Sequence, residues 1–235
     1  MKRTGFLLAA VVMLSCTAKK EKASGTADAP SAFSTDGKKV LVYSTADSSA
    51  YRLSLTDTVE FKEMGQPLET QICVFVDPGK TFQTYFGMGA AMTDASAETF
   101  YKLPKEKQQE LLKAYFDKTN GIGYTVARTN INSCDFSSDM YTYVKDGDTS
   151  LQSFNIEHDK KYKLPFIKEA MQAAGGQLNL FASPWSPPAW MKTSNSLIKG
   201  RLKPEHYGSF ARYLVSYTQA MRKAGAPVDI LTIQN

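Results

Sequence analysis

The sequence is poor in histidine and cysteine and contains no long run of basic residues. Two of its 235 residues are histidines, His158 and His206, so a histidine-rich zinc centre is not expected and a Ser-His-Asp triad would have to use one of the two. No run of lysine and arginine is longer than two residues, which argues against a nucleic-acid groove. These scarcities predict a protein without a metal site and without a nucleic-acid partner.

Neither the composition nor the charge is extreme. Hydrophobic residues make up 43% and charged residues 22%, values typical of globular domains and not of disordered, collagenous or multi-span membrane proteins. The 28 basic and 23 acidic residues leave a formal charge of 28 − 23 = +5. At about 150 residues per domain, the length allows one large domain or one and a half domains.

The longest apolar run lies at the amino terminus and is too short for a membrane span. Lys2 and Arg3 precede the run GFLLAAVVML, which ends just before Cys16. Such a run extends about 15 Å as a helix, half of a bilayer core, so residues 1–16 are interpreted as a secretory signal. The position of Cys16 resembles the lipobox of bacterial lipoproteins, which predicts an exported protein held to a membrane by lipid on Cys16. An ordinary cleaved signal with a coincidental cysteine is the alternative.

Residues 17–39 are mostly Lys, Ala, Ser, Thr and Gly, with one aromatic residue. A segment of this composition cannot bury enough apolar area to order itself, so a flexible linker is predicted. Beyond Cys16, two cysteines remain, Cys73 and Cys134. An exported protein could join them in a disulfide, and two free thiols are equally compatible with the sequence.

Two kinds of pattern follow the linker. Residues 40–84 show short alternating stretches without a helical period, which predict β-strands at 40–43, 51–55 and 71–76. Residues 85–235 instead alternate strand and helix signals, with strands predicted at 85–90, 124–131, 178–181 and 228–233. Helices are predicted from Pro104, Pro165 and Pro204. This βαβαβαβ order predicts a parallel α/β sheet with crossover helices.

The polar residues that follow the predicted strands indicate a binding site, because parallel strands carry their functional residues at their carboxyl ends. Asp135 follows the second strand and Trp185 the third. A carboxylate accepts hydrogen bonds from neighbouring hydroxyls, and an indole face covers the C–H side of a sugar ring, so the pair predicts a sugar site. Alone, each has a simpler interpretation, Asp135 as a turn cap and Trp185 as a core aromatic. Arg128 lies inside an apolar strand and is expected to pair with a carboxylate, in a structural or a functional ion pair.

Four segments together give the chain a specific resemblance. FGMGAAMTDASA (residues 86–97), GIGYTVARTNINSCDFS (121–137), FASPWSPPAWMKT (181–193) and LTIQN (231–235) resemble glycoside hydrolase family 30, which includes the glucosylceramidases. The resemblance implies a (β/α)8 TIM barrel, of which about the first four strands are present in residues 85–235. It also implies a β-sandwich side domain, to which residues 40–84 contribute the first strands.

The resemblance also implies roles for single residues. Asp135 and Trp185 would contact the sugar of a β-glycoside or glycolipid, Asn235 would bind its 2-hydroxyl, and Arg128 would support the catalytic carboxylates. In the family, the acid/base glutamate follows the asparagine of the fourth strand and the nucleophile follows the seventh strand. Both glutamates are therefore expected beyond Asn235, and no catalytic residue, metal or cofactor is assigned within the chain.

Two other functions are compatible with parts of the pattern. A non-catalytic sugar-binding lipoprotein would keep Asp135 and Trp185 for recognition alone. A dinucleotide-dependent oxidoreductase would use Gly87 and Gly89 as a phosphate loop, although the third glycine of that motif is replaced by Met92. The preferred prediction is a retaining β-glycosidase of the glucosylceramidase type, represented here by the part that holds the substrate.

Overall fold

The computed structural model describes residues 33–176 and 178–235. The predicted signal with Cys16, and the predicted linker up to residue 32, lie outside the described residues. The chain divides into two compact units, Met1–Gln83 and Thr84–Asn235. None of the helices among the described residues has the length and apolar character needed to span a bilayer.

The first unit is built on a β-hairpin. Strands β1 (Lys39–Ser44) and β2 (Ser54–Glu60) pair antiparallel, with a shift in register at Val42 and Tyr43. The strand predicted at 71–76 is wrong, because residues 61–88 form neither helix nor strand, and Ile72 and Val74 are fully or almost fully exposed. An alternating segment becomes a strand only when a neighbouring strand pairs with its backbone and covers its apolar face, and the described residues offer it neither.

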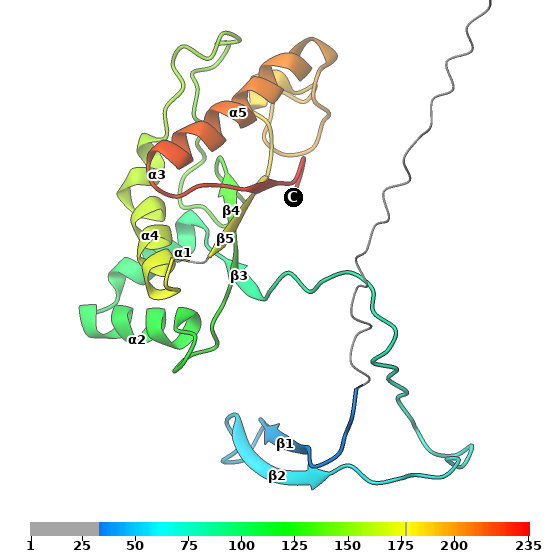
Figure 1. Cartoon of the computed structure of the whole chain (residues 1–235). Coiled ribbons are helices and arrows are strands. Elements are labelled where there is room, and N and C mark those ends of the chain that lie inside the picture. The colour runs from blue at the N-terminus through cyan, green and yellow to red at the C-terminus, as the bar shows by residue number, and fades with distance from the viewer. Residues whose placement is uncertain (1–32, 177) are drawn as a thin grey trace, which may run out of the picture. The chain divides into compact units, whose positions relative to one another are not determined.

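The second unit contains the parallel sheet that the sequence predicted. Strands β3 (Gly89–Ala91), β4 (Val126–Ile131), β5 (Asn179–Pro184) and β6 (Ile230–Leu231) lie in the order β3-β4-β5-β6, and all are parallel (Figure 1). The two outer strands are shorter than predicted, since each has a ladder partner on one side only. The α/β prediction is confirmed.

The helices connect these strands. The second unit contains α1 (Asp94–Lys102), α2 (Lys105–Phe116), α3 (Glu157–Lys161), α4 (Lys163–Ala173) and α5 (Tyr207–Lys223), with short 3-10 turns at Ala189–Met191 and Pro204–His206. Thr93 caps α1, because its hydroxyl accepts the Ser96 N–H at 3.1 Å. Pro104 precedes α2, and Gly225 follows α5 with the positive φ that glycine favours at a helix end.

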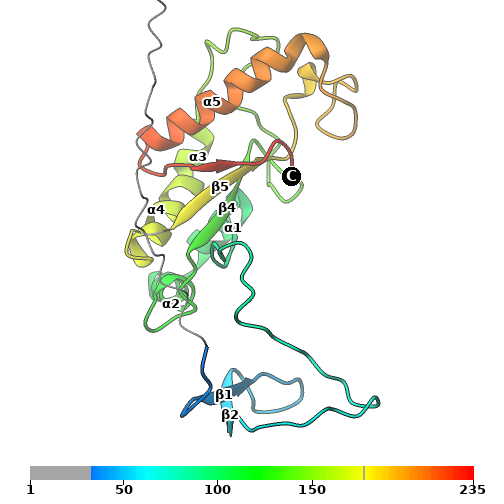
Figure 2. The same cartoon turned by 45° about the vertical axis from the view of Figure 1, so that its right-hand side comes forward.

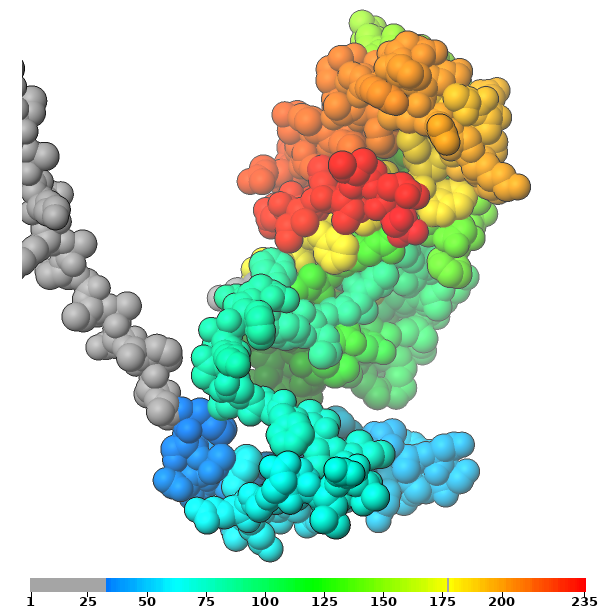
Figure 3. All heavy atoms as spheres, turned by 90° about the vertical axis from the view of Figure 1, so that its right-hand side faces the viewer, coloured from blue at the N-terminus to red at the C-terminus, as the bar shows by residue number. Residues whose placement is uncertain are grey.

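The helices cover one face of the sheet (Figures 1 and 2). Side chains of that sheet face and of the helices form the core. The core includes the strand residues Ala127, Ile131, Leu180 and Ala182 and the helix residues Phe100, Ile167, Tyr213 and Met221. Arg128 and Phe181 are more exposed and alternate with the buried residues of β4 and β5, so they lie on the opposite face, which no helix of the described chain covers. Ile230, in register with Phe181, is exposed as well. Figure 3 shows the carboxyl-terminal segment, in red, at the surface beside the β5 region, in yellow. Among the described residues, the sheet therefore has one open face, and its outer strands β3 and β6 each leave one edge unpaired.

Helix α5 presents one face to the core. Phe210, Tyr217 and Met221 are buried on this face, whereas Tyr207 is exposed. Tyr213 has no accessible surface, although it carries a polar hydroxyl. Its hydroxyl finds hydrogen-bond partners in the loop after β4, which explains how the polar end of a tyrosine is accommodated in the core.

Candidate functional site

The three predicted sugar-binding residues follow the carboxyl ends of neighbouring strands. Ile131, the last residue of β4, is in register with Pro184, the last residue of β5. The backbone N–H of Asn235 donates to the carbonyl of Pro184 at 3.1 Å, which holds the segment after β6 beside the end of β5. Asp135 and Trp185 lie in the loops that leave β4 and β5. The structure therefore brings the three loops together at the carboxyl ends of the parallel strands.

Asp135 is exposed on a well-anchored turn. The Ser133 N–H donates to the Tyr141 carbonyl at 3.1 Å, and the Cys134 N–H donates to the Ser137 hydroxyl at 2.9 Å. The carboxylate of Asp135 itself makes no hydrogen bond or ion pair with other described residues. An ionised carboxylate of this kind keeps all of its acceptor capacity for a ligand with hydroxyl groups.

Trp185 is half-buried between two buried residues, Pro184 and Ser186. No hydrogen bond of the described chain uses its indole N–H, and none joins the side chains of Asp135, Trp185 and Asn235 to one another. The second tryptophan, Trp190, packs edge-on against His206 with ring centroids 5.0 Å apart. Of the two indoles, Trp185 is therefore the one placed directly after a strand end.

Arg128 has a different partner from the one expected. Its Nε donates to the Ser183 hydroxyl at 3.2 Å, and the Thr232 hydroxyl lies 2.7 Å from that same hydroxyl. Among the described residues, no ion pair includes Arg128, so the expected carboxylate partner is absent from this part of the chain. Arg128 and Ser183 belong to β4 and β5, and Thr232 directly follows β6. Arg128 also lines a hollow of about 300 Å³ on the open face of the sheet, together with Phe181 and residues of β3.

The glycines considered for a dinucleotide loop lie in the wrong place for that function. Gly89 is the first residue of β3, whereas a phosphate loop follows a strand and opens a helix. A Cβ on Gly89 would lie 1.5 Å from the Val126 carbonyl oxygen, so the glycine allows two strands to approach closely. The geometry therefore excludes the oxidoreductase alternative based on these glycines.

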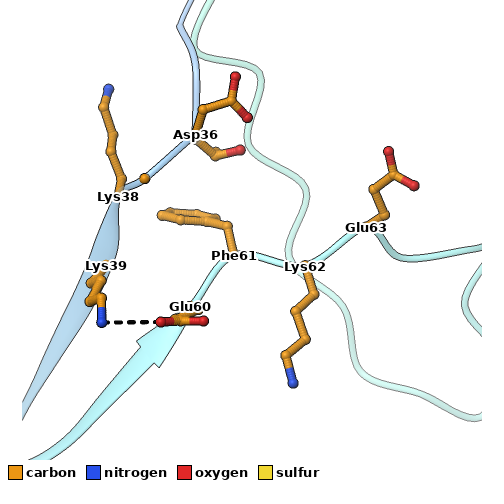
Figure 4. Close-up of a pocket in the computed structure, with 9 residues that line it drawn as sticks. Asp36, Lys38, Lys39, Glu60, Phe61, Lys62 and Glu63 are labelled. Carbon is orange, nitrogen blue, oxygen red and sulfur yellow. Dashed lines mark ion pairs between the residues drawn. The ribbon is translucent and has the colours of Figure 1, made fainter.

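The charged hollow beside the β1–β2 hairpin is also a poor candidate. It measures about 480 Å³ and is lined by residues 35–39 and 60–63, which include the exposed ion pair Lys39–Glu60 at 3.1 Å. The side chains of Lys38 and Lys62 point in opposite directions (Figure 4). Its charges therefore do not converge on one ligand position. Among the described residues, no cluster of three or more His, Cys, Asp and Glu side chains could hold a metal ion.

Buried polar side chains beneath the site were not recognised from the sequence. Asn132, at the start of the β4 loop, is 1% exposed and contacts both Tyr213 and the loop after β5. Asp159 and Lys163 have no accessible side-chain surface and form an ion pair of 3.0 Å. Asn132 lies within the segment 121–137, which carries part of the family resemblance. Lys163 follows two other lysines, and such a basic segment is typical of a solvent-exposed helix start, so its burial could not be predicted.

Comparison with known proteins agrees with this arrangement. The family model of the glycosyl hydrolase family 30 TIM-barrel domain matches residues 85–235, the part that contains the parallel sheet and the site. The chain belongs to glycosyl hydrolase family 30. The second unit therefore belongs to a TIM-barrel domain, and its four described strands are part of such a barrel.

The amino-acid sequence of this family 30 chain is similar to those of several named proteins. It is 40% identical over 170 residues to putative glucosylceramidase 4 of Caenorhabditis elegans, covering 69% of this chain and 32% of that protein. It is 38% identical over 173 residues to the lysosomal acid glucosylceramidase of Mus musculus, covering 71% and 33%. It is 33% identical over 166 residues to an endo-1,6-beta-D-glucanase of Neurospora crassa, covering 67% and 34%. The family 30 chain thus spans about a third of the length of these relatives.

Solved structures resemble about two thirds of the chain. SrfJ of Salmonella typhimurium superposes with a TM-score of 0.62 at 32% identity, covering 65% of this chain and 34% of that one. The endo-beta1,6-glucanase BT3312 superposes with a TM-score of 0.61 at 28% identity, covering 68% and 36%. The chain therefore resembles these two proteins in both sequence and fold.

Proposed function

We propose that this protein is a retaining β-glycoside hydrolase of the glucosylceramidase type, and that residues 85–235 supply the part that holds the sugar. The observation that carries the proposal is the convergence of the loops of Asp135, Trp185 and Asn235 on one edge of a family 30 sheet. Relatives named for glucosylceramide and for a β-1,6-glucan support β-linked glucose as the sugar.

Each residue has a distinct physical task in this proposal. The unpaired carboxylate of Asp135 accepts hydrogen bonds from sugar hydroxyls, and the indole of Trp185 covers the C–H face of the ring. The side-chain amide of Asn235 binds the 2-hydroxyl, as the family resemblance implies. Arg128, already linked to Ser183 and Thr232, presents positive charge from the strand interior toward the carboxylates of the reaction.

The bond-breaking step requires groups that we do not assign within residues 1–235. A retaining glycosidase uses two carboxyl groups about 5–5.5 Å apart, one as acid and then base and the other as nucleophile. The resemblance implies that the acid/base glutamate follows Asn235 and that the nucleophile follows the seventh barrel strand. Asp135 is not a substitute for either, because its task is to remain an anion that accepts hydrogen bonds. We therefore expect the 235-residue chain to bind β-glucosides without hydrolysing them.

The binding test uses the two tryptophans as reporters. The chain is titrated with an alkyl β-glucoside while tryptophan fluorescence is recorded, and Asp135→Asn is compared with Asp139→Asn, an exposed aspartate of the same loop. A hydrogen bond to a charged group contributes about 1.5–3 kcal/mol, so Asp135→Asn should weaken binding about tenfold or more and Asp139→Asn should not. Equal affinity of the two variants, or a wild-type chain that does not bind, would contradict the proposal.

We also propose that the protein is exported and anchored by lipid on Cys16. The sequence of residues 1–16 supports this, with its basic start, short apolar run and terminal cysteine. Metabolic labelling of cells with a fatty-acid analogue should mark the wild-type protein and leave Cys16→Ser unmarked. Equal labelling of both would exclude an anchor at this cysteine.

A further inference from the structure

One buried side-chain amide connects helix α5 to both loops of the proposed sugar site. Asn132 lies at the start of the β4 loop. Its Oδ1 accepts a hydrogen bond from the Tyr213 hydroxyl of α5, and its Nδ2 donates to the Ser186 carbonyl in the β5 loop at 3.0 Å. Asp135 lies a short distance along the first of these loops, and Trp185 directly precedes Ser186 in the second. The Asn132 amide is thus a bridge between the two segments that carry the sugar-binding side chains.

The orientation of this amide is determined by its partners. The Tyr213 hydroxyl accepts the Tyr143 backbone N–H at 2.8 Å, so its own proton is free to point toward Asn132. Burial raises the pKa of Tyr213 well above its ordinary value, which keeps the hydroxyl protonated as a donor. The oxygen of the Asn132 amide therefore faces Tyr213, and its nitrogen faces the Ser186 carbonyl.

The conformation of Asn132 also suits a bridging residue. Its φ is 66°, in the left-handed region that asparagine tolerates better than most residues. This turn directs the amide into the core, where it is 1% exposed. In that position it cannot touch a ligand at the surface, so any effect on binding must act through the loops.

The loop after β5 is also held by a second side chain, that of Lys192. The buried Lys192 ammonium donates to the Ser186 hydroxyl at 2.8 Å and to the Leu197 carbonyl at 2.7 Å. Ser186 is therefore held by Asn132 at its carbonyl and by Lys192 at its hydroxyl. The β5 loop has little freedom next to Trp185, and that freedom is limited by side chains of two different segments.

We infer that Asn132 and Tyr213 are positioning residues, which set the spacing between Asp135 and Trp185 and thereby the affinity for the sugar. The inference rests on the proposed function. Asp135 and Trp185 have no side-chain hydrogen bonds of their own among the described residues, so the placement of each depends on its loop. A loop that can drift presents the two groups at the wrong separation for part of the time, which weakens binding without removing any contact group.

The test compares two tyrosines of α5. Tyr213→Phe removes the hydroxyl that donates to Asn132 and accepts the Tyr143 N–H. Tyr217→Phe removes a buried hydroxyl one turn later that has no hydrogen-bond partner among the described residues. Both rings stack on Tyr143, so the two variants lose the same atom from the same aromatic cluster. One net hydrogen bond corresponds to a change of about five- to tenfold in the dissociation constant. We expect that increase for an alkyl β-glucoside with Tyr213→Phe and less than about a twofold change with Tyr217→Phe.

Asn132→Gly provides the second half of the test. Glycine keeps the left-handed backbone and loses the amide, so this variant should show the same weakened binding as Tyr213→Phe. If both act through one bridge, the double variant should bind no more weakly than the weaker of the two single variants. Thermal melting of each variant gives the separate readout of stability.

The outcomes separate the inference from the proposed function. If the wild-type chain binds, Asp135→Asn weakens binding, and both bridge variants bind like Tyr217→Phe, the positioning role is overturned and the proposed function stands. Additive losses in the double variant also overturn the bridge. If the wild-type chain does not bind the glucoside, the proposed function is wrong and the positioning role is overturned with it.

Discussion

The buried ion pair between Lys163 and Asp159 provides the most informative test of what holds the second unit together. Neither side chain has accessible surface, and the two charged groups lie 3.0 Å apart. The Lys163 ammonium also donates to the Asn130 carbonyl at 2.9 Å and to the Tyr143 hydroxyl at 3.2 Å. The lysine therefore joins α4 to the end of β4 and to the loop that follows it.

Replacing Lys163 with methionine should destabilise the fold severely. Methionine retains much of the apolar volume, but it removes the lysine charge that pairs with the buried Asp159 carboxylate and the donor to the Asn130 carbonyl. Removing one partner of a buried pair costs about 3–5 kcal/mol. With a typical slope of about 2 kcal/mol per molar urea, a loss of about 4 kcal/mol lowers the unfolding midpoint by about 2 M.

The neighbouring exposed pair supplies the control. Lys160 and Glu157 lie 2.6 Å apart, but their side chains are 51% and 68% exposed. An exposed pair contributes about 0–1 kcal/mol, so Lys160→Met should shift the midpoint by less than about 0.5 M. Urea unfolding followed by circular dichroism and by tryptophan fluorescence measures both variants.

The double variant tests the physical reason. Replacing Asp159 with leucine in the Lys163→Met background removes the stranded charge, so the double variant should be more stable than Lys163→Met alone. If Lys163→Met and Lys160→Met have equal midpoints, or if the second substitution only adds to the loss, desolvation of an unpaired carboxylate is not the cause.

Three further predictions follow from single residues. Burial by itself would raise the pKa of Asp159, but Lys163 and hydrogen bonds from neighbouring residues hold that pKa below its ordinary value. Because the folded-state pKa is lowered, the stability that this carboxylate contributes is fully present above the unfolded-state pKa of about 4 and should be lost as the pH falls through the lowered folded-state pKa. The loss of stability with falling pH, measured by urea unfolding, should be smaller in Asp159→Asn. Thr93→Ala removes the cap of α1 and should cost about 1 kcal/mol, whereas Thr93→Ser should cost little; equal losses would argue against the cap. Gly89→Ala should prevent normal folding, since its Cβ would meet the Val126 carbonyl at 1.5 Å, while Gly208→Ala meets ordinary contact distances and should leave the melting temperature nearly unchanged or slightly higher.

Much of the site is predictable because the carboxyl ends of parallel strands all lie on the same side of the sheet. Once the strands before Asp135, Trp185 and Asn235 are recognised, their order brings the three loops together without knowledge of any contact, and the register of β4 with β5 agrees. The bridge beneath the site could not be found in this way. Tyr213 and Asn132 are 81 positions apart, and no local pattern relates them.

The alternation of strands and helices and the family could be predicted from the amino-acid sequence, because apolar periodicity, capping residues, glycines and motifs are local properties of the chain. Three features became known from the three-dimensional structure: Arg128 contacts Ser183, Tyr213 lies in the core, and residues 71–76 form no strand. The reason is that each of these depends on what another segment presents: a hydroxyl on the next strand, an amide at a loop start, or a partner strand. Such contacts are properties of the assembled sheet and its helices, and the local sequence does not contain them.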